Sequence, residues 1–95
     1  MRYQIVKTMT INNLKNYDLF VNWVVGEFDL YLIDKNKTLN IYFPNGYFEI
    51  GNIKSKGRHF CFTISIYSKS KIAFQRIVNS LESIYEHVSL FVSKK

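Results

Sequence analysis

The 95-residue chain is poor in the residues that mark secreted, fibrous or membrane proteins. It has one cysteine, one proline, one tryptophan and four glycines. A single cysteine excludes an internal disulfide, and a lone thiol favours a reducing compartment. No apolar run reaches the roughly 20 residues of a membrane span, and the first residues lack a signal-peptide core. The sequence therefore predicts a soluble, cytoplasmic protein with no membrane partner.

Acidic residues are also scarce. Seven aspartates and glutamates stand against thirteen lysines and arginines, which gives a net charge of +6. This charge favours an acidic partner. Apolar residues make up 47% and aromatic residues 17% of the chain. A chain of this length buries somewhat over about 60% of its unfolded surface, so we expect one compact domain over residues 1–95.

The stretch from Phe28 to Tyr67 alternates between two kinds of side chain with a period of two, as strands with different faces do. One face carries phenylalanine, leucine and isoleucine: Phe28, Leu30, Leu32, Leu39, Ile41, Phe43, Phe48, Ile50, Phe60, Phe62, Ile64 and Ile66. The other carries four tyrosines: Tyr31, Tyr42, Tyr47 and Tyr67. A phenylalanine face favours a dry core, whereas a tyrosine hydroxyl needs a polar partner. The pattern predicts a four-stranded antiparallel meander.

The segment Asn12–Val25 fits two interpretations. As a helix it forms one apolar stripe: Leu14, Tyr17, Val21 and Val24. Asn12 or Asn13 then supplies the N-cap. As a strand, its β-branched part Asp18–Val25 pairs with Phe28–Asp34. The helix is the preferred interpretation.

The two ends of the chain are easier to interpret. Tyr3–Ile11 alternates as a strand does. Ser70–Val92 has an apolar stripe at spacings of three and four, which predicts a long helix across the phenylalanine face. The predicted class is α+β, with an antiparallel meander packed against this C-terminal helix in the order β-α-β-β-β-β-α.

Groups with catalytic potential are few. His59 and Cys61 lie two apart on one strand without a third group to orient them. Adding His87 gives three metal ligands but no fourth, and the spacing matches no known zinc motif. The sequence therefore predicts no catalytic residues, no metal site and no cofactor, and we expect a protein that is not an enzyme.

Basic residues gather in two turns that a meander places at the same end of the sheet. They form a predicted basic rim: Lys35, Lys37, Lys54, Lys56 and Arg58. The four tyrosines of the adjoining face complete the predicted binding surface. Positive groups attract phosphates or carboxylates, and aromatic rings stack or pack. The alternative is a set of ordinary solvated lysines.

A second predicted site opens the long helix. Ser68, Lys69, Ser70 and Lys71 place two lysines where the helix dipole disfavours cations. An anion bound by these lysines and by free backbone N–H groups would explain the arrangement. Exposed lysines without a ligand are the alternative.

These features favour a small non-enzymatic binding protein that engages nucleic acid or an acidic protein surface. The five residues isoleucine, lysine, asparagine, phenylalanine and tyrosine dominate the chain, as in genes rich in A/T. Phages and plasmids fit this composition. The alternative prediction is therefore an inhibitor from a phage or mobile element that, like anti-CRISPR proteins, blocks a host defence protein by direct contact. A homodimer that covers the tyrosine face is also considered.

Overall fold

The structure is a computed structural model that describes residues 2–29, 31–35 and 38–93, with side-chain surroundings up to Val88. Its elements follow the chain in this order: β1 (Tyr3–Ile11), α1 (Leu14–Glu27), β2 (Leu32–Asp34), β3 (Leu39–Phe43), β4 (Gly46–Ile50), β5 (Lys54–Lys56), β6 (His59–Ser68) and α2 (Lys71–Ser93). The predicted α+β class is confirmed. The short strand β5 was not predicted. Its exposed Lys-Ser-Lys sequence has no apolar alternation, and it is a strand because it pairs with β6.

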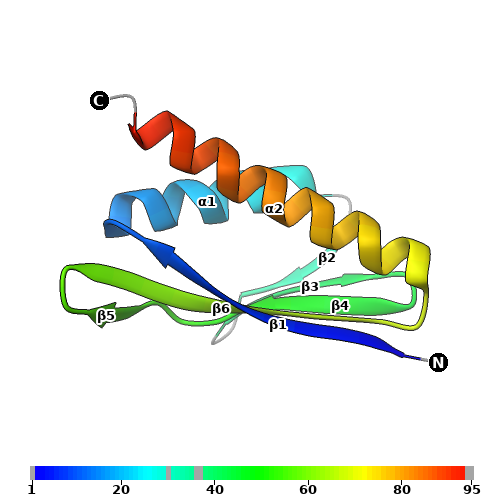
Figure 1. The fold of residues 1–95 in the computed structure, drawn as a ribbon. Coiled ribbons are helices and arrows are strands. Elements are labelled where there is room, and N and C mark those ends of the chain that lie inside the picture. Colours follow the sequence, from blue (N-terminus) through cyan, green and yellow to red (C-terminus); the bar gives the residue numbers. More distant parts are fainter. Residues whose placement is uncertain (1, 30, 36–37, 94–95) are drawn as a thin grey trace.

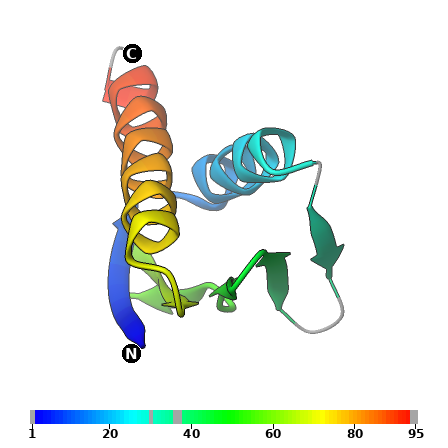
Figure 2. The same cartoon turned by 90° about the vertical axis from the view of Figure 1, so that its right-hand side faces the viewer.

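All strand pairs of the described sheet are antiparallel, in the order β1-β6-β4-β3-β2, with β5 also paired to β6. Both helices lie on the same side of this sheet, so one face is covered and the other is open (Figures 1 and 2). Within the described ranges, neither helix is apolar enough along its length to cross a membrane.

The hydrophobic core lies between the covered face and the helices. Its buried members come from both layers: Ile11, Phe20, Val24, Phe28, Leu39, Ile41, Phe43, Phe48, Ile50, Phe62, Ile64, Ile66, Ile77, Leu81, Ile84 and Val88. Phe20 of α1 contacts Phe62 of β6 with ring centroids 5.5 Å apart. The strand residues in this list are those that the period-two pattern places on the apolar face, apart from β2.

Helix α1 confirms the preferred interpretation of the ambiguous segment. The Asn13 side chain caps it, because its Oδ1 accepts a hydrogen bond of 2.8 Å from the Asn16 N–H. The helix ends where the Phe28 N–H donates to the Val24 carbonyl at 3.0 Å. The alternative interpretation, in which Asp18–Val25 pairs as a strand, is therefore excluded.

Strand β2 has the opposite register to the prediction. Leu32 is 71% exposed on the open face, whereas Ile33 is partly buried against the core. Phe28 is buried as part of the helix end rather than as a strand residue. The Tyr31 N–H donates to the Phe28 carbonyl at 3.1 Å, and this turn resets the alternation before β2 begins. The predicted position Leu30 lies outside the described residues.

Strand β1 carries a charge on the covered face. Lys7 is the one break in its apolar pattern, and it forms an ion pair with Glu82 of α2. Further along, the Tyr85 hydroxyl of α2 donates to the Thr10 carbonyl. These two contacts tie the long helix to β1, which forms an edge of the sheet.

Tyr17 of α1 is a tyrosine on the covered side. Its hydroxyl donates to the Gly51 carbonyl at 3.2 Å, and its ring meets Phe62 edge-on at 5.0 Å. Burial raises the pKa of the Tyr17 hydroxyl, and the nearby charge of Asp18 adds to the effect.

Candidate functional site

Three tyrosines form a row across the open face, which we call the tyrosine row: Tyr42, Tyr47 and Tyr67. Cross-strand pairing sets them side by side, because Tyr42 pairs with Tyr47 and Tyr47 pairs with Tyr67. Their ring centroids are 5.9 and 5.7 Å apart, and the planes are tilted by 36° and 37°. Leu32 pairs with Tyr42 and extends the row to β2. The row is an aromatic surface with an apolar end.

The rings of this row are accessible. Tyr42 is 41% and Tyr47 is 40% exposed, and Tyr67 is partly exposed. No helix covers them, since both helices lie on the far side of the sheet (Figure 2). Rings held in this way can stack on planar ligands or pack against a partner surface.

Small polar side chains continue the open face along the two long strands. Thr8 and Thr10 of β1 pair with Thr63 and Cys61 of β6. Thr8, Thr10 and Thr63 are exposed. This region offers hydroxyl groups for hydrogen bonding and no bulky side chain.

Two acids, Glu49 and the exposed Asp34 of β2, belong to the open face near the tyrosine row. Glu49 of β4 is partly exposed, and its Oε2 accepts a hydrogen bond of 2.6 Å from the Thr38 hydroxyl. Thr38 also accepts from the Asn40 side chain at 3.1 Å. The Glu49 carboxylate is thus engaged by neighbours on the same face.

The β5–β6 hairpin brings three basic side chains together, and we call Lys54, Lys56 and Arg58 the basic hairpin. Lys54 pairs with Cys61 and Lys56 with His59, so both lysines belong to the open face. Arg58 lies in the turn beside Gly57, whose φ of +66° favours glycine. All three basic residues are exposed.

The basic hairpin and the tyrosine row lie at opposite ends of the open face. Six residues of β6 separate Tyr67 from Cys61, the partner of Lys54, which corresponds to about 20 Å. The predicted arrangement, in which the tyrosines adjoin the rim, is therefore replaced by an elongated surface.

The predicted rim is also not compact. Strand β3 begins at Leu39, which pairs with Ile50, and Ile50 pairs with Ile64. Since β6 begins at His59, the basic hairpin extends about 17 Å past the turn that carries Lys35. Lys35 is exposed at the same end of the sheet. Lys37 lies outside the described residues.

Tyr31 does not belong to the tyrosine row. Its ring contacts Phe28 at 6.0 Å, and it precedes Leu32, which faces the open side. Tyr31 is 36% exposed at the sheet margin. The structure thus brings together three of the four predicted tyrosines.

The serines of the predicted anion site cap their own helix. Ser68 is fully buried, and its hydroxyl both donates to the Ser70 carbonyl and accepts from the Ser70 N–H at 3.0 Å. The Ser70 hydroxyl accepts from the Ala73 N–H at 3.2 Å. Only Lys69 and Lys71 of this predicted site have exposed side chains. The burial of Ser68 removes it from any ligand-binding role.

Charge is divided between the two layers. Outside the helices, residues 1–13 and 28–70 carry eight basic and three acidic residues, a net charge of +5. The two helices carry three basic and four acidic residues, a net charge of −1, and the remaining +2 belongs to Lys94 and Lys95, which lie outside the described residues. The sheet layer with its turns is therefore the cationic part of the protein. An anionic ligand is attracted to this layer more than to the helices.

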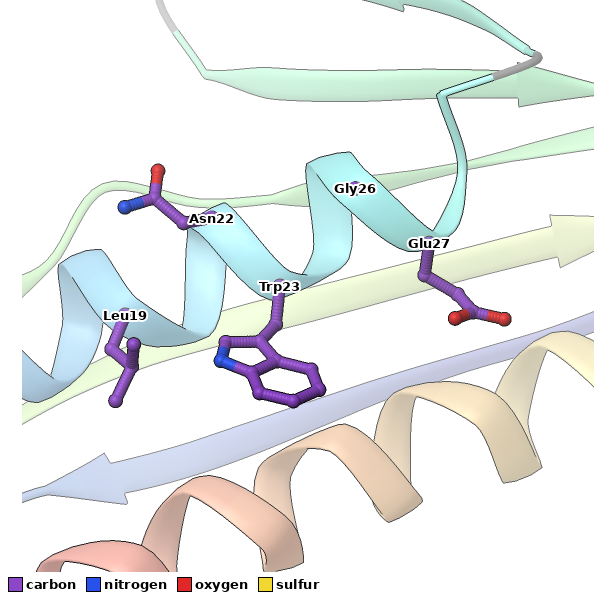
Figure 3. A pocket seen from close by; sticks show the side chains of 5 residues that line it. All are labelled: Leu19, Asn22, Trp23, Gly26 and Glu27. Carbon is purple, nitrogen blue, oxygen red and sulfur yellow. The ribbon is translucent and has the colours of Figure 1, made fainter.

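The helical layer carries an exposed aromatic residue that the sequence patterns did not single out. Trp23 of α1 is 47% exposed, and its ring contacts the His87 ring of α2 with centroids 5.0 Å apart and planes tilted by 50°. It lines a shallow hollow of about 410 Å³ with four neighbours: Leu19, Asn22, Gly26 and Glu27. Figure 3 shows Leu19, Trp23 and Glu27 extending from one side of α1 and Asn22 from the other. The sequence could have indicated this exposure, because Trp23 lies beside the apolar stripe of the predicted helix and not within it.

Comparison with protein-family models and with curated proteins finds no match to this chain, so a functional proposal rests on the surface itself.

Proposed function

We propose that this protein binds nucleic acid through the open face of its sheet and does not catalyse a reaction. The observation that carries the proposal is the coincidence of charge and aromatic rings on one layer. The sheet layer has a net charge of +5, whereas the helices have −1. Phosphates are attracted by the lysines and arginines, and bases stack on aromatic rings.

Aromatic exposure favours nucleic acid over an acidic protein. Tyr42 and Tyr47 are each about two-fifths exposed and lie in ring contact with each other. Carboxylates of an acidic protein would use the lysines but would leave the ring faces unused. A nucleic acid uses both groups, because each nucleotide has a charged phosphate and a planar base.

The test compares two triple charge reversals. Lys54→Glu/Lys56→Glu/Arg58→Glu alters the basic hairpin, and Lys15→Glu/Lys71→Glu/Arg76→Glu alters three exposed residues on the helices. Both change the net charge equally. Lys7 is avoided because it pairs with Glu82. Binding of labelled DNA and RNA is measured by fluorescence anisotropy between about 50 and 200 mM salt.

We expect the hairpin triple to weaken binding strongly and to reduce the slope of log K against log salt by about 2 for single strands and about 3 for duplex DNA, as three lost phosphate contacts would. The helix triple should have a much smaller effect. Equal weakening by both triples would show that the charge acts diffusely. Absence of binding to any nucleic acid by the unaltered protein would reject the proposal, and binding to an acidic protein would then be tested.

The exposure of Trp23 favours a second candidate function, inhibition of another protein by direct contact. Exposed tryptophans are enriched among the residues that dominate protein interfaces. In this case the protein would be the phage or mobile-element inhibitor of a host defence protein that the composition indicates. Capture of a specific protein after nuclease treatment, lost in Trp23→Ala and retained in the hairpin triple, would support this function. Light scattering in parallel tests for a homodimer.

A further inference from the structure

We infer that the nucleic acid on this face is single-stranded and runs along β6 from the basic hairpin, which holds its phosphates, to the tyrosine row, which crosses β6, β4 and β3 and on which its bases stack. This inference rests on the proposed nucleic-acid binding. It adds the class of strand, the path and a separate role for each end of the surface.

The tyrosine row suits a ligand with accessible ring faces. Its three rings follow one another at 5.9 and 5.7 Å across three neighbouring strands. Base faces are concealed inside a duplex, where each base pair stacks on the next, and a protein reaches only edges and phosphates. In a single strand the bases are free to stack on aromatic side chains. The row therefore favours single strands.

The middle of the open face leaves room for a strand to pass. Between the tyrosine row and the basic hairpin, β6 presents Ser65 and Thr63, and β1 presents Thr8 and Thr10. These side chains are short and mostly exposed, and their hydroxyls can bond to base edges or sugars. The adjacent Val6 is 59% exposed and offers an apolar contact. The path from one end to the other is thus unobstructed and polar.

The basic hairpin supplies charge where the tyrosine row supplies none. Lys54 and Lys56 face the open side about 20 and 26 Å from the row, and Arg58 lies at the hairpin tip. A strand long enough to reach both ends gains stacking at one end and charge neutralisation at the other. Oligonucleotides across the usual range of site sizes, about 4 to 16 nucleotides, will show at which length both contributions are present.

The first experiment compares one sequence as a single strand and as a duplex, in DNA and in RNA. We expect the single strand to bind at least about tenfold more tightly in one or both chemistries. Equal or tighter binding of the duplex overturns this inference and leaves the proposed nucleic-acid binding intact. Absence of binding to every form rejects both.

The second experiment separates stacking from charge at constant fold. Tyr47→Ala should weaken single-strand binding by about 5- to 150-fold, the equivalent of one lost stacked base, with the salt slope unchanged. Tyr47→Phe should remain within about threefold, because stacking needs the ring and not the hydroxyl. Tyr31→Ala is the matched control, since Tyr31 is similarly exposed but lies off the row.

One result would overturn the separate roles of the tyrosine row and the basic hairpin. If Tyr47→Ala changes binding no more than Tyr31→Ala does, while the hairpin triple abolishes it, the ligand is held by charge alone and the row plays no part. Thermal unfolding of each variant confirms that the compared proteins are folded.

Discussion

Neighbouring residues of one strand meet different surroundings in this protein. Phe48 is fully buried beneath the helices, whereas Tyr47 next to it is 40% exposed on the open face. Phe62 and Thr63 of β6 repeat the contrast, with Phe62 buried and Thr63 exposed. The covered face consists mainly of apolar side chains, and the open face mainly of side chains that also carry hydrogen-bonding groups. The covered face holds the core, and the open face is the surface on which we propose that a ligand binds.

The largest expected effect comes from breaking the covered face at Phe48. Phe48→Ala removes a fully buried ring, and we expect the free energy of unfolding to fall by about 3–5 kcal/mol. Tyr47→Ala, one residue away, should cost about 1 kcal/mol or less because its ring is already partly hydrated. Urea denaturation of both variants measures the difference. Similar losses would mean that the open face is also part of the core.

A second prediction concerns the approach of β4 to β6. A Cβ on Gly46 would lie 2.1 Å from the Tyr67 carbonyl oxygen and 2.8 Å from the Ser68 Cα. Gly46→Ala should therefore cost about 1–3 kcal/mol, as overpacking does. Gly26→Ala is the control, since nothing lies within 4 Å of its added Cβ in α1. It should stabilise the protein by about 0.5–1 kcal/mol, and a loss there equal to that at Gly46 would contradict the prediction.

The smallest effect sharpens the contrast between tyrosines on the two sides. Tyr17→Phe removes the hydrogen bond to Gly51 on the covered side and should cost about 0.5–1.5 kcal/mol at neutral pH. Tyr47→Phe on the open face should cost less than about 0.5 kcal/mol.

The same variant has a defined pH dependence. Burial raises the pKa of Tyr17 in the folded protein above its unfolded value. The folded state then holds this proton more tightly, so the contribution is complete below about pH 10, the unfolded pKa, and is lost as pH rises through the folded pKa. The stability gap between the unaltered protein and Tyr17→Phe should therefore narrow at alkaline pH. A gap that stays constant would contradict the assignment.

The architecture was largely predictable because two simple periods dominate the sequence. Alternation with period two identified the apolar sides of β3, β4 and β6, and the stripe of α2 required a helix above them. The error at β2 has a local cause. Phe28 closes α1 and the following turn resets the alternation, so Leu32 faces outward. Such a turn shifts the alternation, and a prediction that assumes one fixed period cannot include this shift.

The proposed binding surface was predictable in most of its members and less so in its arrangement. Pairing across β3, β4 and β6 follows from the alternation, and it brings Tyr42, Tyr47 and Tyr67 together. The position of the basic hairpin does not follow, because it depends on the interruption between Ile50 and Lys54. There the chain adds β5 beyond the end of β4 and carries the lysines away from the turn of Lys35. How far the hairpin extends along the sheet depends on the pairing of β5 with β6, which the residue pattern does not show.

The central place of β6 also determines the order in which the molecule can be assembled. Strand β1 pairs only with β6 among the described strands, and Tyr3 lies opposite Ser68. The backbone of the first strand is therefore paired only after the last strand, β6, has been made. Bringing β1 and β6 together closes a long loop, which costs conformational entropy before the strands can form stabilising contacts. Such non-local pairing slows folding. On a ribosome, the edge of the sheet and the cover of α2 can form only after β6 has emerged.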